Sequence, residues 1–144
     1  MRTRLLSTTV IAAIVAAIMS QAVTAAQPKT TICGQIKHGP HATYTFMLTN
    51  KKLTGTTWTV FSTGVPCSVA MKAAPAILRW WAKAKIDASN YSANGFGCNK
   101  ESDGRGSAGS AGCSYSKGPP LANIELMMTG SYTIVQLKRL FFIS

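Results

Sequence analysis

The sequence predicts an α+β fold: a small, mainly antiparallel sheet of three to four strands, packed by one helix at about residues 68–85 and held by two disulfides. Three observations lead to this prediction. Several short stretches are rich in β-branched and aromatic residues or alternate apolar with polar ones, as strands do. One longer stretch has a helical period. Finally, four cysteines occur in a chain of only 144 residues.

The first 26 residues have the three-part layout of a secretory signal peptide. Two arginines precede an apolar run from Leu5 to Met19, and small residues continue to Ala26. This run is shorter than the roughly 20 apolar residues that a membrane-spanning helix needs, which favours cleavage over an anchor. We therefore expect a signal peptide over residues 1–26 and one small domain over residues 27–144, secreted or otherwise extracytoplasmic.

Four stretches are predicted as strands: residues 31–36, 44–49, 56–62 and 123–128. We expect the second and third of these to pair antiparallel across a polar turn at residues 50–55. The last stretch places Ile124, Leu126 and Met128 on one face. For the tail at residues 129–144 we expect an extra edge strand or an apolar tail that docks on the domain.

Between Ser68 and Lys85 the apolar residues recur with a helical period. Ser68 is the expected N-cap, since its hydroxyl can accept a hydrogen bond from the free amides of the first turn. Pro75 lies inside this stretch, removes one backbone donor and biases Ala74 away from helical angles. The sequence leaves open whether Pro75 kinks the helix or splits it in two.

The predicted helix has a basic side. Lys72, Arg79 and Lys83 fall close together around the helix axis, and Trp81 points to the opposite, apolar side. Trp80 flanks the basic side, and adjacent cationic and indole groups suit the binding of polyanions. Lys72, Arg79, Trp80 and Lys83 are therefore a candidate binding face, and the simpler alternative is a solvated helix surface.

The four cysteines indicate two disulfides, because an even number in a small exported chain is typical of a disulfide framework. No pair has the C-x-x-C spacing of a zinc or redox site. Of the three pairings that the sequence permits, we favour Cys33–Cys67 and Cys98–Cys113, because each joins neighbouring segments without crossing. The second would close a glycine- and serine-rich tip at residues 101–112, which we expect to be flexible.

The chain is strongly basic, with a formal charge of +11. Without the two arginines of the expected signal peptide, the remaining 13 basic and four acidic residues give +9. Such a charge favours anionic partners: a cell-envelope polymer, a membrane surface or an acidic extracellular protein. Nucleic acid is not favoured for an exported chain. We expect no cofactor, and the sequence does not indicate an oligomeric state.

The inventory of reactive side chains argues against an enzyme. Four carboxylates are present: Asp87, Glu101, Asp103 and Glu125. Glu101 and Asp103 lie in the expected flexible tip, which is a poor place for general acid–base catalysis. His38 and His41 offer two metal ligands without a third. The Gly-x-Ser-x-Gly motif of serine hydrolases is absent. We therefore expect no catalytic residue and no metal site.

One stretch resembles a pattern in small exported proteins of actinobacteria. In that pattern a strand leads into Val-Ser-Cys-x-x-Ala, which opens a helix, and two later strands each carry a cysteine. Here Trp58-Thr59-Val60 precedes Gly64-Val65-Pro66-Cys67-Ser68-Val69-Ala70, and Gly97-Cys98 and Ala111-Gly112-Cys113 complete the layout. Pro66 replaces the usual serine. The resemblance covers residues 58–128. It implies an exported location and this fold, and it transfers no functional residues.

Together these observations predict a small exported basic protein that binds an anionic envelope or extracellular partner and is not an enzyme. Two alternatives remain open. The first is a small secreted inhibitor of an extracellular enzyme that presents the segment between Cys98 and Cys113, although its glycine content argues against a pre-organised inhibitory loop. The second is a cationic membrane-active protein that uses the apolar tail.

Overall fold

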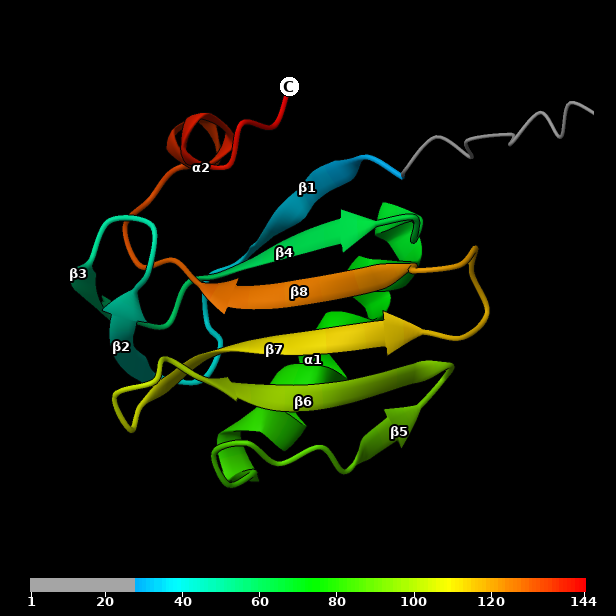
Figure 1. Cartoon of the computed structure of the whole chain (residues 1–144), viewed down its shortest axis with the longest axis horizontal. Helices are drawn as coiled ribbons and strands as arrows, with labels where there is room; N and C mark the ends of the chain where they lie inside the picture. Colours follow the sequence, from blue (N-terminus) through cyan, green and yellow to red (C-terminus); the bar gives the residue numbers. More distant parts are fainter. Residues whose placement is uncertain (1–27) are drawn as a thin grey trace, which may run out of the picture.

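The computed structural model describes residues 28–144, which form a six-stranded sheet, a two-stranded hairpin and two helices (Figure 1). The expected signal peptide lies outside the described residues. Every strand pairing is antiparallel, and the large sheet has the order β1-β4-β8-β7-β6-β5. The bounds are β1 (Thr30–Ile36), β2 (Ala42–Phe46), β3 (Lys51–Gly55), β4 (Trp58–Thr63), α1 (Cys67–Lys83), β5 (Tyr91–Ala93), β6 (Phe96–Ser102), β7 (Ala108–Tyr115), β8 (Asn123–Met128) and α2 (Ile134–Leu140).

The predicted α+β class and the mainly antiparallel sheet are confirmed, but the predicted number of strands is too low. The four predicted strands overlap β1, β2, β4 and β8, although β2 begins at Ala42 and ends at Phe46 instead of spanning residues 44–49. The polar segment at residues 50–55 was expected to be a turn and contains β3. The glycine-rich segment at residues 101–112 was expected to be a flexible tip and lies mostly in β6 and β7.

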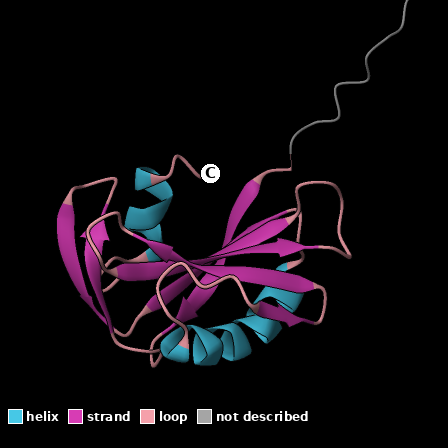
Figure 2. Ribbon diagram, turned by 60° about the horizontal axis from the view of Figure 1, so that its bottom comes forward, coloured by secondary structure: helices cyan, strands magenta, loops and turns pink. Residues whose placement is uncertain are grey.

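The two helices lie on opposite faces of the large sheet (Figure 2). On the face of α1, the central strands β4 and β8 contribute Trp58 and Val60 opposite Met128 and Leu126. These four side chains and Ile77 of α1 are fully buried. Alternation along each strand therefore directs one set of side chains to a core under α1 and the other set to the opposite face.

Helix α1 begins one residue earlier than predicted and ends two residues earlier. Pro66 is the N-cap in place of Ser68, and no side chain caps the first turn. Because proline has no amide hydrogen, Pro66 adds no unsatisfied donor at the start of the helix. The helix continues through Pro75 as one element, so it is not split there. Pro75 is exposed, so its ring lies on the solvent side of the helix.

Lys100 of β6 supports the other end of α1. Its ammonium group donates hydrogen bonds to the carbonyl oxygens of Trp81, at 2.9 Å, and Ala84, at 2.8 Å. It also lies 4.0 Å from the centroid of the Trp81 ring. A cation at the carbonyl end of a helix is favourable, because the last carbonyl groups have no partner within the helix. Burial lowers the pKa of Lys100.

Strand β2 pairs with β3, so the predicted pairing of residues 44–49 with residues 56–62 is wrong. The chain reverses earlier than predicted, at Met47–Asn50, where Asn50 has a left-handed conformation with φ of 51°. Leu53 then faces Tyr44 across the hairpin. Strand β4 instead pairs with β1 and β8 in the large sheet.

The tail contains helix α2 and not the edge strand that was one of the two expectations. Thr133 and Gln136 form a capping box that begins this helix. Leu137 is fully buried, so the tail docks on the domain. Of the helices that the structure describes, neither is long and apolar enough to cross a membrane.

Both predicted disulfides are confirmed. Cys33–Cys67 joins β1 to the first residue of α1. Cys98–Cys113 joins residues that lie directly opposite each other in β6 and β7. The second disulfide therefore does not close a flexible loop, because the strands continue past it on both sides.

The two edges of the large sheet are irregular or short. At one edge, the pairing of β1 with β4 shifts register between Ile32 and Gly34, next to Cys33. At the other edge, β5 contains only three residues.

Candidate functional site

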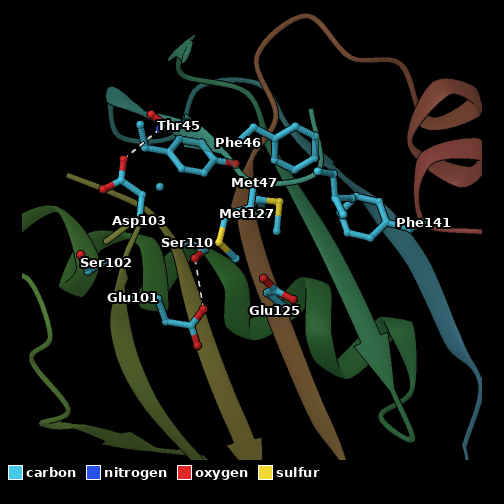
Figure 3. Close-up of a pocket in the computed structure, with 13 residues that line it drawn as sticks. Thr45, Phe46, Met47, Glu101, Ser102, Asp103, Ser110, Glu125, Met127 and Phe141 are labelled. Atoms are coloured by element: carbon cyan, nitrogen blue, oxygen red, sulfur yellow. Dashed lines mark hydrogen bonds between the residues drawn. The ribbon is translucent and has the colours of Figure 1, made fainter. Parts of the chain in front are cut away.

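A cavity of about 240 Å³ lies on the sheet face that α1 leaves uncovered (Figure 3). The β2–β3 hairpin bounds it on one side, β6, β7 and β8 form its floor, and Phe141 bounds it beside α2. Its wall is mainly apolar, yet three carboxylates line it: Glu101, Asp103 and Glu125. A mostly apolar concavity with a few polar groups is the usual form of a small-molecule site.

Tyr44 anchors the hairpin side of the cavity. Its ring lies directly on Gly109 of β7, where an added Cβ would be 2.1 Å from Tyr44 Cδ1. Its hydroxyl donates a hydrogen bond to the carbonyl oxygen of Met128 at 2.9 Å. Burial and the negative charge of Glu125 raise the pKa of Tyr44. Tyr44 is therefore neutral and has a structural role, and its ring can pack on β7 only because residue 109 is a glycine.

The Glu101 carboxylate extends from β6 over the backbone of β7. It accepts hydrogen bonds from Asn99 Nδ2 and Ser110 Oγ, each at 3.2 Å. An added Cβ at Gly112 would lie 2.3 Å from Glu101 Oε1. Gly112 therefore leaves open the space that the carboxylate occupies. Because Gly112 is paired with Glu125 of β8, the Glu101 carboxylate approaches Glu125.

Glu125 is half-buried on the same face, between Phe61 of β4 and Gly112 of β7. Phe61 packs on Phe141, with 4.8 Å between the ring centroids, so this side of the carboxyl group is apolar. Burial raises the pKa of Glu125 to about 7, and the negative charge of Glu101 contributes. Glu125 therefore exchanges its proton near neutral pH.

Asp103 has a structural role. Its carboxylate accepts backbone hydrogen bonds from Thr45 at 2.9 Å, Arg105 at 2.8 Å and Ser107 at 3.1 Å. These bonds, first of all that from Thr45, lower the pKa of Asp103. They close the turn between β6 and β7 and tie it to the hairpin. Asp103 is thus already occupied, and Glu101 and Glu125 are the carboxylates open to a ligand.

The expectation that Glu101 lies in a flexible tip is wrong, because Glu101 belongs to β6. The sequence analysis also missed that Glu101 and Glu125 line the same cavity. Two sequence signals could have revealed it. Ile124 and Leu126 share the core face, so Glu125 between them must point to the other face. The pairing of Cys98 with Cys113 also implies a hairpin register that carries Glu101 onto the sheet.

Three of the four residues of the candidate binding face on α1 are exposed to solvent. Lys72, Arg79 and Lys83 are exposed. Trp80 is half-buried: its Nε1 donates to Asn90 Oδ1 at 2.9 Å, and its ring packs on Tyr91 with 5.5 Å between centroids. The indole thus holds the loop before β5, and the three cations are the free groups of this face.

The two histidines lie apart from the cavity. His38 and His41 are exposed in the connection between β1 and β2. Within residues 28–144, no group of three or more His, Cys, Asp and Glu side chains is placed to hold a metal ion.

Comparisons of the chain with protein-family models, with curated proteins and with solved structures find no match. The functional assignment therefore depends on the geometry and charge of the chain itself.

Proposed function

We propose that the chain is an exported, non-enzymatic basic protein that binds an anionic partner of the cell envelope or extracellular space through the outer side of α1. The observation that carries this proposal is the separation of charge across the sheet. Helix α1 has three basic residues and no acidic one. Three of the four carboxylates line the cavity on the opposite sheet face. An anionic surface that approaches α1 therefore meets three cations, and the one remaining carboxylate, Asp87, comes only after the last residue of the helix, Lys83.

Export is supported by the disulfides and by the resemblance to exported actinobacterial proteins. Two disulfides in a small domain are consistent with an extracytoplasmic protein, because the cytoplasm keeps most thiols reduced. Binding without catalysis is proposed from the small inventory of reactive side chains. Asp103 is satisfied by backbone amides, and His38 and His41 lie apart from the cavity in the connection between β1 and β2.

The test is sedimentation of the purified, oxidised protein with an anionic wall polymer such as polyglycerol phosphate. The triple variant Lys72→Gln/Arg79→Gln/Lys83→Gln should bind on the order of 100-fold more weakly at low salt, given about 1 kcal/mol for each cation near an anionic surface. A second triple variant, Lys51→Gln/Lys52→Gln/Lys117→Gln, removes the same charge elsewhere.

The control variant should keep most of its affinity if α1 is the binding face. Equal losses in the two triple variants would show that only net charge matters and would contradict the assignment to α1. Binding should also weaken steeply as salt increases, because exposed charges are screened.

A second candidate is attachment to an anionic membrane surface by the end of the molecule that carries the hairpin turn and the tail. Phe142 is 95% exposed and Met47 82%, although both are large apolar side chains. Lys51, Lys52 and Arg139 are exposed in the same segments. Apolar side chains flanked by cations suit the boundary between lipid head groups and acyl chains.

Vesicle sedimentation separates the two candidates. The variant Met47→Ser/Leu48→Ser/Phe142→Ser should lose binding to vesicles with anionic lipid and keep binding to the wall polymer. Deletion of residues 137–144 is a poor test, because it removes the buried Leu137 and exposes the core. The inhibitor alternative gains no support: Cys98 and Cys113 are buried in the sheet, so their segment is not a separate loop.

A further inference from the structure

The cavity opposite α1 combines apolar walls with a pair of carboxyl groups. Tyr44, Phe46, Met127 and Phe141 contribute apolar wall. The rings of Phe46 and Phe141 pack on each other, with 6.0 Å between their centroids. Glu101 and Glu125 lie together on the floor, and Figure 3 shows both on the same sheet face. We propose that this cavity binds a small organic cation, an amine on an apolar body, with the ammonium group at Glu101 and Glu125. This inference concerns the opposite face and does not depend on the proposed function of α1.

Charge complementarity selects a cation. The chain has a net charge of +11, yet none of the residues that line the cavity is basic. Within residues 28–144, no protein donor contributes to the pKa of Glu125, which responds only to burial and to Glu101. Two adjacent carboxyl groups without a cation are unfavourable when both are ionised. An ammonium group from outside would relieve this repulsion and donate hydrogen bonds to both.

The walls select an amine on an apolar body over a metal ion. Within residues 28–144, no three His, Cys, Asp or Glu side chains are placed to hold a metal ion together, and a hydrated cation would gain nothing from the apolar wall. The apolar side chains would instead cover a short alkyl or aromatic group. A volume of about 240 Å³ restricts the occupant to a small molecule.

Binding of a cation should release a proton. The titratable groups that face Glu125 are Glu101 on β6 and the Tyr44 hydroxyl on β2, and Asp103 lines the cavity at the turn after β6. Tyr44 stays neutral because its pKa is raised, and Asp103 stays ionised because its pKa is lowered. An ammonium group favours the ionised form of Glu125, so the proton of Glu125 passes to the buffer.

The experiment is isothermal titration of the oxidised protein with three molecules of similar shape: 2-phenylethylamine, 2-phenylethanol and phenylacetate. The amine should bind at least about ten-fold more tightly than the neutral alcohol, because hydrogen bonds to charged groups are stronger. Phenylacetate should bind most weakly. At pH 7, repetition in buffers of different ionisation enthalpy should show release of about half a proton, since Glu125 titrates at about 7.

Two variants locate the site. Glu125→Gln keeps the shape of the side chain and should lose both the preference for the amine and the proton release. Asp87→Asn removes the same charge from an exposed loop and should change neither. Gly112→Ala is a further variant that leaves both carboxyl groups in place. It should weaken amine binding because it displaces the Glu101 carboxylate.

Several outcomes would overturn the proposal. These are equal affinity for amine and alcohol, no binding of either, or a proton release that persists in Glu125→Gln. Nα-acetyl-lysine amide, which keeps the ε-ammonium group of lysine, is the second amine to test. Tighter binding of this amide than of 2-phenylethylamine would assign the cavity to the lysine side chain of a partner protein and would reject a small-molecule occupant.

Discussion

Lys100 and Glu125 are charged side chains on opposite faces of the large sheet, and their surroundings differ. Lys100 is almost completely buried and donates to two carbonyl oxygens at the end of α1. Glu125 is half-buried and has Phe61 and Glu101 as neighbours. A buried charge with partners supports the fold, whereas one without them destabilises it. The first is therefore structural, and the second is available for a ligand.

The pKa of Glu125 makes stability depend on pH. In the unfolded chain this carboxyl group titrates near 4.5, and in the folded protein near 7. The folded state holds the proton of Glu125 more tightly than the unfolded state does. The contribution of Glu125 to the free energy of unfolding is therefore most favourable below about pH 4.5 and is lost as the pH rises through about 7. Glu125→Gln should therefore be more stable than the wild type at about pH 8, by on the order of 2 kcal/mol.

Urea unfolding of both proteins across this pH range measures the difference. The advantage of Glu125→Gln should shrink toward about pH 4.5, where Glu125 is protonated in both states. Glu101→Gln is the informative control: it removes the neighbouring charge, so the pH dependence that comes from Glu125 should become weaker. If the free energies of unfolding of the wild type and Glu125→Gln differed by the same amount at all pH values, the pKa of Glu125 would not be shifted in the folded protein.

At the scale of elements, the β2–β3 hairpin docks on the large sheet through a few contacts. The Tyr44 ring lies on Gly109, and Thr45 donates its amide to Asp103. Gly109→Ala should force the ring away and destabilise the protein by about 2 kcal/mol, the usual scale for an overpacked contact. Trypsin should then cleave faster after Lys51 and Lys52, since the hairpin loses its support.

Gly97→Ala is the matched control in the same pair of strands. An added Cβ at Gly97 would be 3.5 Å from Ser114 Oγ, which is ordinary contact. This variant should keep the cleavage rate of the wild type. Similar effects of the two substitutions would show that loss of glycine, and not the contact with Tyr44, determines how the hairpin docks.

The elements that the sequence predicted are those whose side chains share one environment. β1, β4, β8 and α1 each carry an apolar face against a common core, so periodicity identifies them. The resemblance implied strands at Cys98 and Cys113, but the adjoining residues 101–112 were expected to be a flexible tip, because Gly109 and Gly112 are typical of loops. Here these glycines give room to Tyr44 and Glu101, which come from other elements. The secondary-structure propensity of a segment gives no information about contacts with other elements. The predicted Cys98–Cys113 disulfide, however, already implied that β6 and β7 form a hairpin.

At the scale of the molecule, the two disulfides should provide much of the stability. Their sequence separations are 34 and 15 residues. In the chain-entropy model these loops correspond to about 4 and about 3 kcal/mol. Cys33→Ala/Cys67→Ala should therefore lower the urea midpoint more than Cys98→Ala/Cys113→Ala. Removal of both pairs should approach the total stability of a small domain, about 5–15 kcal/mol.

Tryptophan fluorescence during urea unfolding can follow these variants, because Trp58 and Trp81 are buried between α1 and the sheet. Trp58 and Trp81 also pack on each other, with 4.7 Å between centroids. If a variant that lacks both disulfides unfolded at the same urea concentration as the wild type, the apolar core alone would account for the stability of the domain.

The irregular edges of the large sheet have a consequence for how these molecules behave when crowded. A straight, fully exposed edge strand offers a row of unpaired amide and carbonyl groups, to which a neighbouring molecule can add a strand. Here one edge changes register beside a disulfide, and the other is three residues long. Neither edge is a good template for growth of a larger β-structure. We therefore expect the backbone geometry to oppose aggregation at high concentration, separately from the repulsion that the charge of the chain provides.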